Sequence, residues 1–392
     1  MTPRLRDVVG GGWRTLADFR QLLLHVTCAE YTLLVSDPED EAPWREPAVG
    51  AYWNASHLGL TGTERLRAEV DGRIPLSPIS RLTGVKPTDG GAGTATFSMP
   101  ATGWLTGSQG LILGGTLAIL ADGPLAAAIG TALPPGKGLV TSELSLRFLR
   151  PVRVGGDLLA LGTLVRAGRS IGLSHVRVID GRGRMVADGS SMCFIRSIPP
   201  QGQGDRAAHR TKRAGRFPQF FTRAGPVATT RTGRGSRTRA MGPDERARDF
   251  RAQKAGELPN PPIYFLTGMR IEDAVPGEIF FALPAHGWLS SPQRTVQGGA
   301  LAMLADTALN CAIFASTPVG TAVASMDLKV NYLRPVVPDG RDLRAHGRVR
   351  HIGRTIAVAE SEVTNADGKT VVLATGSAML RSASPANLSK PD

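Results

Sequence analysis

The chain has 392 residues, of which 42% are hydrophobic and 20% charged, which is enough apolar material for two domains with sizeable cores. Its three cysteines lie far apart and match no disulfide framework or metal-ligand spacing, which predicts reduced thiols in a cytoplasmic protein without a metal site. The formal net charge is +13, and residues 198–245 hold ten Lys and Arg against three acidic residues. Over half of the net charge therefore belongs to one stretch.

The sequence predicts no membrane partner. Its longest apolar run, residues 111–121, ends at Asp122, whereas a membrane-spanning helix needs about 20 residues. Residues 1–20 carry six charged side chains and so lack the apolar region of a signal peptide.

A shift of 184 residues superimposes two parts of the chain: residues 78–152 align with 262–336 without a gap. "PISRLTG" (78–84) falls on "PIYFLTG" (262–268), "MPATGWL" (99–105) on "LPAHGWL" (283–289), and "LRPV" (149–152) on "LRPV" (333–336). Such self-similarity indicates an internal duplication. We expect an N-terminal segment of unassigned role (1–61), repeat 1 (62–197), a linker (198–245), repeat 2 (246–383) and a C-terminal tail (384–392).

Both repeats predict the same order of elements. A short polar helix is followed by a strand, around 94–99 or 278–283, and then by a long apolar helix, roughly 112–132 or 296–315. Alternating residues such as Leu144, Leu146 and Phe148 indicate strands next, and further strands fit 157–167, 171–180 and 185–195. "DGRGR" (180–184) and "NADGK" (365–369) predict hairpin turns. A buried helix followed by antiparallel strands predicts an α+β unit whose sheet curls around the helix.

The linker is rich in Arg, Gly, Thr and Pro and lacks apolar periodicity, which is typical of a flexible segment. The alternative is a basic arm for nucleic acid or a membrane surface. No RNA-binding motif surrounds its few aromatic residues, Phe217, Phe220 and Phe221. We therefore expect a solvated linker and no nucleic-acid partner.

Each long helix carries one carboxylate among apolar residues: Asp122 in "LILGGTLAILADGPLA" and Asp306 in "TVQGGALAMLADTALN". Burying a carboxylate costs several kcal/mol unless other groups compensate it. A polar residue at a helix–helix contact is the structural interpretation. Because the feature is repeated at the same offset from a glycine pair, a functional interpretation is favoured.

The glycine pairs, Gly114–Gly115 and Gly298–Gly299, open the two helices. The first turn of a helix offers unpaired N–H groups at the positive end of its dipole, and glycine lets a ligand come close, so this end suits a carbonyl oxygen that becomes negative. The carboxylate lies eight residues further on, about 12 Å along the axis. If the helices pack antiparallel, Asp122 approaches Gly298–Gly299 and Asp306 approaches Gly114–Gly115. The duplication then predicts two composite sites between the repeats.

The segments "VQGGALAMLAD" and "SMDLKVNYLRP" in repeat 2 resemble the PaaI-type acyl-CoA thioesterases of the hotdog fold. The resemblance covers both repeats, about 64–196 and 247–382. It implies two tandem hotdog domains, each a long central helix wrapped by a curved antiparallel sheet, which form an intramolecular pseudo-dimer. It also implies an acyl-CoA substrate and no cofactor, and further association into a homo-oligomer is an expectation because hotdog proteins often associate through their sheets.

By position, Asp122 and Asp306 match the family's catalytic carboxylate, which acts as a nucleophile or as a general base toward water. The resemblance assigns further roles by position: Gly114, Gly115, Gly298 and Gly299, with Gln297 beside them, match the site of the thioester carbonyl, and Thr141 and Ser325 match a hydroxyl that assists the water or orients the carboxylate.

The chain departs from the family where a His usually precedes the glycines, because Gln297 stands there in repeat 2 and Leu113 in repeat 1. The Asn that is common seven residues before the first glycine is replaced by Ser291 and Gly107. Gly123 and Pro124 follow Asp122 and are poor helix formers that could displace its carboxylate. We therefore expect two unequal sites.

Two sets of charged residues remain. Arg166, Arg169, Arg350 and Arg354 flank glycines between strands and are candidate contacts for CoA phosphates, with an ordinary surface role as the alternative. His286 has Thr102 as its counterpart in repeat 1, and we expect it at the surface.

The leading hypothesis is an acyl-CoA thioesterase. The first alternative is a non-catalytic acyl-CoA binding or regulatory protein, which the missing His and Asn favour. The second is an enoyl-CoA hydratase or dehydratase, a chemistry that relies on a His paired with an acid, and neither helix contains a His.

Overall fold

The computed structural model describes residues 31–32, 42–197, 229–230 and 243–382. Most of the expected linker, the C-terminal tail and most of residues 1–41 lie outside the described residues. Helix α7 begins at Pro243, so three residues assigned to the linker belong to a helix instead. Two short strands, β1 (Tyr31–Thr32) and β8 (Thr229–Thr230), pair with each other antiparallel.

Repeat 1 contains the predicted elements in the predicted order, together with elements that the sequence did not predict, such as strand β2. Its elements are α4 (Gly62–Val70), α5 (Pro78–Thr83), β2 (Lys86–Gly91), β3 (Thr94–Pro100), the 3-10 helix η3 (Gly103–Leu105), α6 (Gly114–Gly130), β4 (Lys137–Phe148), β5 (Asp157–Ala167), β6 (Ile171–Ile179) and β7 (Met185–Ser197). They are preceded by η2 (Pro43–Arg45) and α3 (Ala55–Leu58).

Repeat 2 has the same elements in the same order. They are α7 (Pro243–Lys254), α8 (Pro262–Thr267), β9 (Arg270–Val275), β10 (Glu278–Pro284), η5 (Gly287–Leu289), α9 (Gly298–Ala315), β11 (Thr321–Tyr332), β12 (Asp342–Ile352), β13 (Ile356–Thr364) and β14 (Thr370–Ser382).

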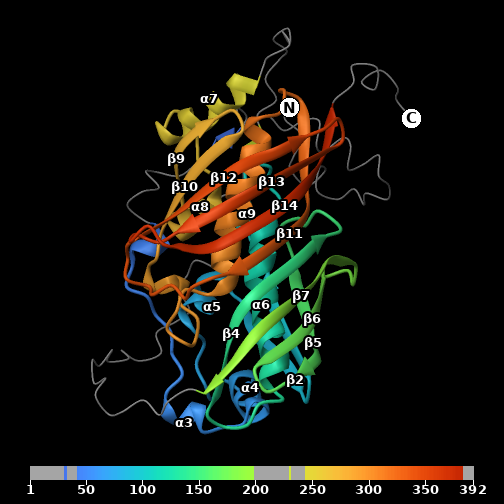
Figure 1. Ribbon diagram of the computed structural model, residues 1–392, viewed down its shortest axis with the longest axis vertical. Helices are drawn as coiled ribbons and strands as arrows, with labels where there is room; N and C mark the ends of the chain where they lie inside the picture. Colours follow the sequence, from blue (N-terminus) through green and yellow to red (C-terminus); the bar gives the residue numbers. More distant parts are fainter. Residues whose placement is uncertain (1–30, 33–41, 198–228, 231–242, 383–392) are drawn as a thin grey trace, which may run out of the picture.

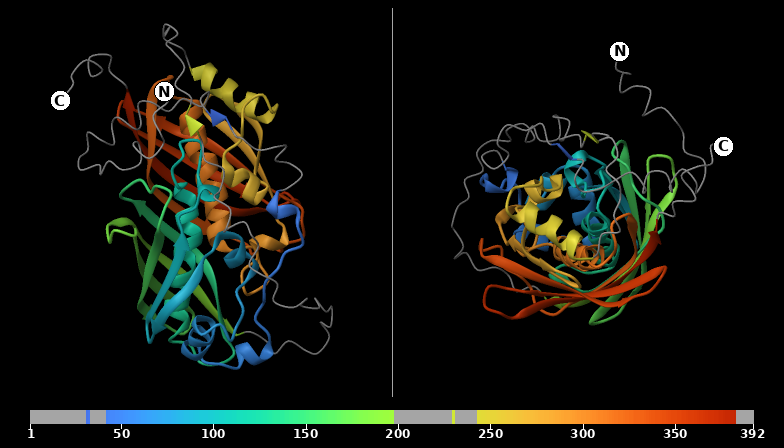
Figure 2. Two further views of the ribbon diagram at one scale, coloured as in Figure 1. Left: turned by 180° about the vertical axis from the view of Figure 1, so that it is seen from behind. Right: turned by 90° about the horizontal axis from the view of Figure 1, so that it is seen from above.

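One twelve-stranded antiparallel sheet joins the repeats, in the order β2-β3-β5-β6-β7-β4-β11-β14-β13-β12-β10-β9. At its centre β4 pairs with β11, with Ser145 opposite Lys329. These two residues are themselves 184 positions apart, so a pseudo-twofold axis passes between them. The sheet curves around α6 and α9, which lie side by side on its concave face (Figures 1 and 2). This is the tandem hotdog arrangement that the resemblance implied.

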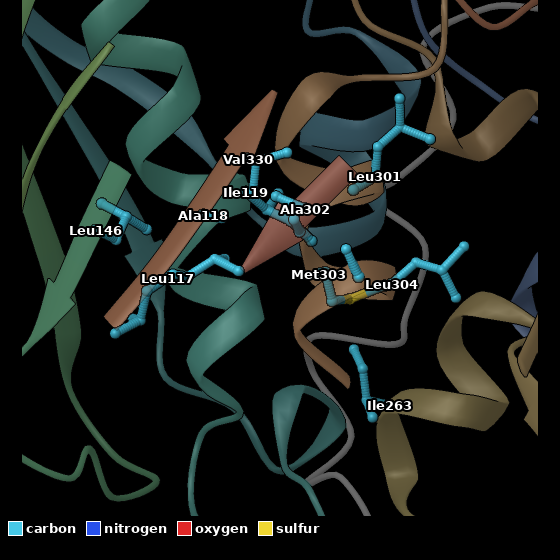
Figure 3. Packing of buried hydrophobic residues seen from close by; sticks show 14 of the residues in the cluster. Leu117, Ala118, Ile119, Leu146, Ile263, Leu301, Ala302, Met303, Leu304 and Val330 are labelled. Atoms are coloured by element: carbon cyan, nitrogen blue, oxygen red, sulfur yellow. The ribbon is translucent and has the colours of Figure 1, made fainter. Parts of the chain in front are cut away.

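The two long helices share one hydrophobic core with the inner face of the sheet. Side chains from both helices and from strands of both repeats meet there (Figure 3), and they include Leu117, Ile119, Leu146, Met303 and Val330. Alternate residues of each strand point inward, which explains why Leu144 and Leu146 are buried. The repeats therefore do not have separate cores.

The second glycine of each pair permits a very close approach of the helices. A Cβ on Gly299 would lie 2.5 Å from Ile119 Cα, and one on Gly115 would lie 2.7 Å from Met303 Cα. Real Cβ atoms do not come so close, so these glycines are required by packing. The contacts place the first turn of each helix against the middle of the other, and the helices are antiparallel.

Helix α6 continues through Gly123 and Pro124 to Gly130, so these two residues do not end it. Of the described helices, α9 is long and apolar enough to cross a membrane by length and composition, and 78% of it is buried inside the protein. Its position between the sheet and α6 accounts for its apolar character.

Residues 42–60, which we call the N-terminal strap, bridge the two repeats. Trp44 stacks on His286 with ring centroids 5.7 Å apart, and Trp288 Nε1 donates to Glu46 O at 2.7 Å, both in repeat 2. Further along, Trp53 N donates to Pro292 O of repeat 2 at 2.9 Å, and its indole Nε1 donates to Glu69 of repeat 1. The strap therefore lies across the loop that leads to Gly298.

Candidate active site

The antiparallel helices bring each carboxylate to the glycine pair of the other repeat. Gly299 N donates to Asp122 Oδ2 across 3.4 Å. A Cβ on Gly298 would lie 3.3 Å from both Asp122 oxygens, and one on Gly114 would lie 3.4 Å from Asp306 Oδ2. A side chain at the first glycine of each pair would therefore crowd a carboxylate. We call the two places the Asp122 site and the Asp306 site.

In the Asp122 site, Thr141 Oγ1 donates to Asp122 Oδ1 at 3.1 Å. Thr141 lies on β4, where a bulge between Thr141 and Glu143 shifts the register against β7. Asp122 is buried, and 7% of the residue as a whole is exposed. Burial raises the pKa of Asp122, and the hydrogen bonds from Thr141 and the Gly299 amide act against this rise.

Three further side chains complete the Asp122 site. Tyr332, at the end of β11, donates from its hydroxyl to Gly298 O at 2.9 Å. Gln297 Nε2 donates to Ile119 O at 3.0 Å, which ties the start of α9 to the helix that carries Asp122, while its Oε1 is buried without a partner. Cys193 lies 4.0 Å from Thr141 Oγ1, and burial raises the pKa of its thiol to about 12, so it is not a nucleophile there.

The Asp306 site is built differently. Asp306 is 0% exposed, and Asn310 Nδ2 of the same helix donates to its Oδ1 at 2.8 Å. Burial raises the pKa of Asp306 to about 7, while the Gly115 amide and Asn310 act to lower it. The Gly115 N–H faces the carboxylate but does not form a good hydrogen bond with it. Asp306 Oδ2 is therefore left without a hydrogen-bond partner. The Asp306 carboxylate is therefore fixed by a hydrogen bond at Oδ1 but not at Oδ2.

Ser325 was expected to match Thr141, but it makes no hydrogen bond to Asp306 among the described residues. Asn310, one helical turn beyond Asp306, donates to Oδ1 instead. Its counterpart in repeat 1 is Ala126. In place of Tyr332 the Asp306 site has Phe148, whose ring lies against Gly114. In place of Gln297 it has Leu113, which precedes α6 and has no side-chain donor for the opposing helix.

Asn310 and Tyr332 were missed from the sequence. The repeat alignment contains the signal, because positions 310 and 332 are polar where positions 126 and 148 are apolar. Such differences between two copies show where the copies have diverged, although they do not indicate which side chain reaches the carboxylate.

The four candidate arginines lie at the ends of strand hairpins and are exposed. Arg350 forms an ion pair with Glu360, which raises the pKa of its guanidinium. Gly172, beside the hairpin that carries Arg166 and Arg169, lies against Ile129 of α6. Ile129 is seven residues beyond Asp122, roughly 10 Å along the helix.

The expectation that His286 lies at the surface is wrong. It is 9% exposed, its Nε2 lies 2.9 Å from Thr267 O, and Trp44 of the strap covers its ring. Burial lowers its pKa to about 4, so it is neutral at pH 7. The sequence of repeat 2 alone could not show this, because the covering residue lies 242 positions away.

Comparisons with known proteins identify the family of the two repeats. The sequence profile of the thioesterase superfamily matches the chain twice, at residues 109–187 and 293–372, one match in each repeat. A Halobacterium salinarum protein named "Putative esterase" is 41% identical over 106 residues, which cover 26% of this chain and 68% of that protein.

Among solved structures, the PaaI protein of the E. coli phenylacetic acid degradation operon is 26% identical, with a TM-score of 0.32, over 36% of this chain and 97% of its own. An acyl-CoA thioesterase II, TesB2, from Mycobacterium marinum is 13% identical, with a TM-score of 0.47, over 80% of this chain and 99% of its own.

The fold and the paired helix termini define a tandem hotdog protein. The chain belongs to the thioesterase superfamily, with one copy of the superfamily's domain in each repeat, and it is a hydrolase that acts on thioester bonds.

Proposed function

We propose that the protein hydrolyses acyl-CoA thioesters at a composite site between the repeats, and that the Asp122 site is the working one. The observation that carries this proposal is the position of the Asp122 carboxylate, 3.4 Å from the amide of Gly299 at the start of the opposing helix. This separation is long for a hydrogen bond, so the N–H is only weakly engaged and is available to a thioester oxygen.

The reaction needs a base or nucleophile and a donor for the developing oxyanion. In the base route, Asp122 takes a proton from water as the water oxygen bonds to the thioester carbonyl carbon. The carbonyl oxygen becomes negative and is stabilised by the Gly299 N–H and the positive end of the α9 dipole. The carbon–sulfur bond then breaks, and the coenzyme leaves as a thiol with the proton that Asp122 held. No cofactor takes part in this scheme. Direct attack by the carboxylate is the other route.

Two differences favour the Asp122 site over the Asp306 site. Asp122 retains 7% exposure and a hydroxyl partner on a separate strand, whereas Asp306 is fully enclosed and held by its own helix.

The hairpin that carries Arg166 and Arg169 supports binding of an anionic coenzyme near the Asp122 site. Gly172 beside it packs against α6 beyond Asp122, and two guanidinium groups suit phosphate recognition. In this assignment the acyl group lies toward the buried helix interface and the phosphates lie toward the exposed hairpin.

The second candidate function is acyl-CoA binding without turnover, which the enclosed Asp306 site favours. Thiol release from a panel of acyl-CoAs separates the two functions. We expect turnover by the wild type and at least a 100-fold loss in Asp122→Asn/Asp306→Asn, an order of magnitude typical for a lost catalytic base. Binding without thiol release on any substrate would establish the second function instead.

A further inference from the structure

Tyr332 and Phe148 are counterparts, 184 residues apart, and each lies at the first glycine of the helix in its own repeat. Tyr332 Cζ is 3.4 Å from the position of a Cβ on Gly298, and Phe148 Cζ is 3.3 Å from the same position on Gly114. The two rings therefore occupy equivalent places. They differ in the hydroxyl group, which Tyr332 uses to donate to Gly298 O at 2.9 Å.

The carbonyl of Gly298 and the N–H of Gly299 are two ends of one peptide group. Tyr332 donates to the oxygen end, and the N–H end faces Asp122 Oδ2 at 3.4 Å. A donor at the carbonyl oxygen draws electron density from the nitrogen, and consecutive hydrogen bonds strengthen one another by about 10–30% each. Gly299 and Asp122 are buried and the Tyr332–Gly298 hydrogen bond is partly buried, so water screens this effect less than it would at the surface.

We propose that Tyr332 is a positioning residue of the Asp122 site: its hydroxyl fixes and polarises the Gly298–Gly299 peptide, which makes the Gly299 N–H a stronger donor to the thioester oxygen. This inference rests on the proposed function. The Asp306 site lacks the same support, because Phe148 leaves the Gly114–Gly115 peptide without this donor.

The surroundings keep the Tyr332 hydroxyl in its donating form. Burial raises the pKa of Tyr332 well above its ordinary value, and the negative charges of Asp122 and Glu143 would raise it further. The group therefore remains protonated through the range in which the carboxylate is ionised. Tyr332 does not exchange a proton with the substrate in this scheme.

Tyr332→Phe tests the inference, because it removes the hydroxyl and keeps the ring against Gly298. We expect kcat for thiol release from acyl-CoA to fall about 3- to 10-fold, as for the loss of one neutral hydrogen bond. KM should stay within about twofold, because the charge on the oxygen grows only in the transition state. Tyr264→Phe is the control, because it removes a hydroxyl from a buried tyrosine of α8 whose ring packs on Phe281 of β10.

An unchanged kcat in Tyr332→Phe, a loss confined to KM, or an equal loss in Tyr264→Phe would overturn the inference. If Tyr332→Phe fails to fold, judged by its Tm, 3-fluorotyrosine at position 332 replaces it. Its hydroxyl is a stronger donor, so kcat should rise above that of the wild type, and a value at or below the wild type would overturn the inference.

Asp122→Asn distinguishes this inference from the function on which it rests. If Asp122→Asn abolishes turnover and Tyr332→Phe does not change it, only the role of Tyr332 is wrong. If Asp122→Asn retains full turnover, the assignment of the working site is itself wrong.

Discussion

Asp122 and Asp306 hold the same place in the two repeats but differ in the groups that compensate their burial. Asp122 receives a hydroxyl from β4 and an amide from the opposing helix, both outside its own helix. Asp306 receives Asn310 from its own helix and leaves one oxygen without a partner. A carboxylate held from outside its helix is positioned relative to both repeats, as a composite site requires.

The raised pKa of Asp306 predicts a pH-dependent cost to stability. Burial brings this pKa to about 7, above its ordinary value of 3.8. Between about pH 4 and pH 7 the folded chain holds a proton that the unfolded chain releases, so the free energy of unfolding falls as pH rises. The described groups that bond Asp306 or face it, Asn310 and the Gly115 amide, do not titrate.

Asp306→Asn removes this titration. The Tm of the variant relative to the wild type should therefore increase steadily from pH 4 to pH 8, measured by thermal melts in one series of buffers. A constant Tm difference across that range would show that Asp306 is not destabilised by ionisation in the folded state.

At the scale of elements, the N-terminal strap is the feature that makes the repeats most unequal. Its backbone accepts the Trp288 Nε1 proton at Glu46 O, whereas the counterpart nitrogen of Trp104 is buried without a hydrogen-bond partner. The strap also lies along Arg294, a non-glycine residue with a φ of 65° whose counterpart is Gly110. The strap therefore packs against the loop before Gly298, and Gly298 belongs to the Asp122 site.

Trp44→Ala should uncover His286. With the indole removed, water reaches the ring and the His286 pKa should rise from about 4 toward its ordinary value of 6.5. A pH titration of the histidine ring signals by NMR measures this shift. Arg45→Ala is the matched control, since Arg45 is exposed and its guanidinium lies over the Trp44 ring rather than over His286. An unchanged titration in Trp44→Ala would mean that the strap does not bury this ring.

The elements also show how far sequence reasoning extends. The long helices were expected at 112–132 and 296–315 and run over Gly114–Gly130 and Gly298–Ala315, because a glycine pair marks each start. Strands β2 and β9 were missed, since "KPTDGG" and "RIEDAV" are short, polar edge strands with little periodicity. The strap was left unassigned because its contacts with repeat 2 join residues more than 200 positions apart.

Of the candidate site, the approach of each aspartate to the other helix could be reasoned from an eight-residue spacing. The side chains that form hydrogen bonds with each aspartate could not all be predicted in this way. Which of Ser325 and Asn310 reaches Asp306 depends on the packing of β11 against α9, and no local pattern records that packing.

At the scale of the whole molecule, the repeats form one folding unit. They share a continuous sheet through β4 and β11 and a common core around α6 and α9. We expect differential scanning calorimetry to show one unfolding transition whose calorimetric and van't Hoff enthalpies agree. Two resolved transitions would show that the repeats unfold independently and that the shared core contributes little.

The most direct test of the central claim compares Asp122→Asn and Asp306→Asn in thiol release from the best acyl-CoA substrate. We predict that Asp122→Asn lowers kcat at least about 100-fold, while Asp306→Asn retains most of the wild-type rate. Loss of turnover in Asp306→Asn alone, with Asp122→Asn fully active, would contradict the account and place the reaction at the enclosed site.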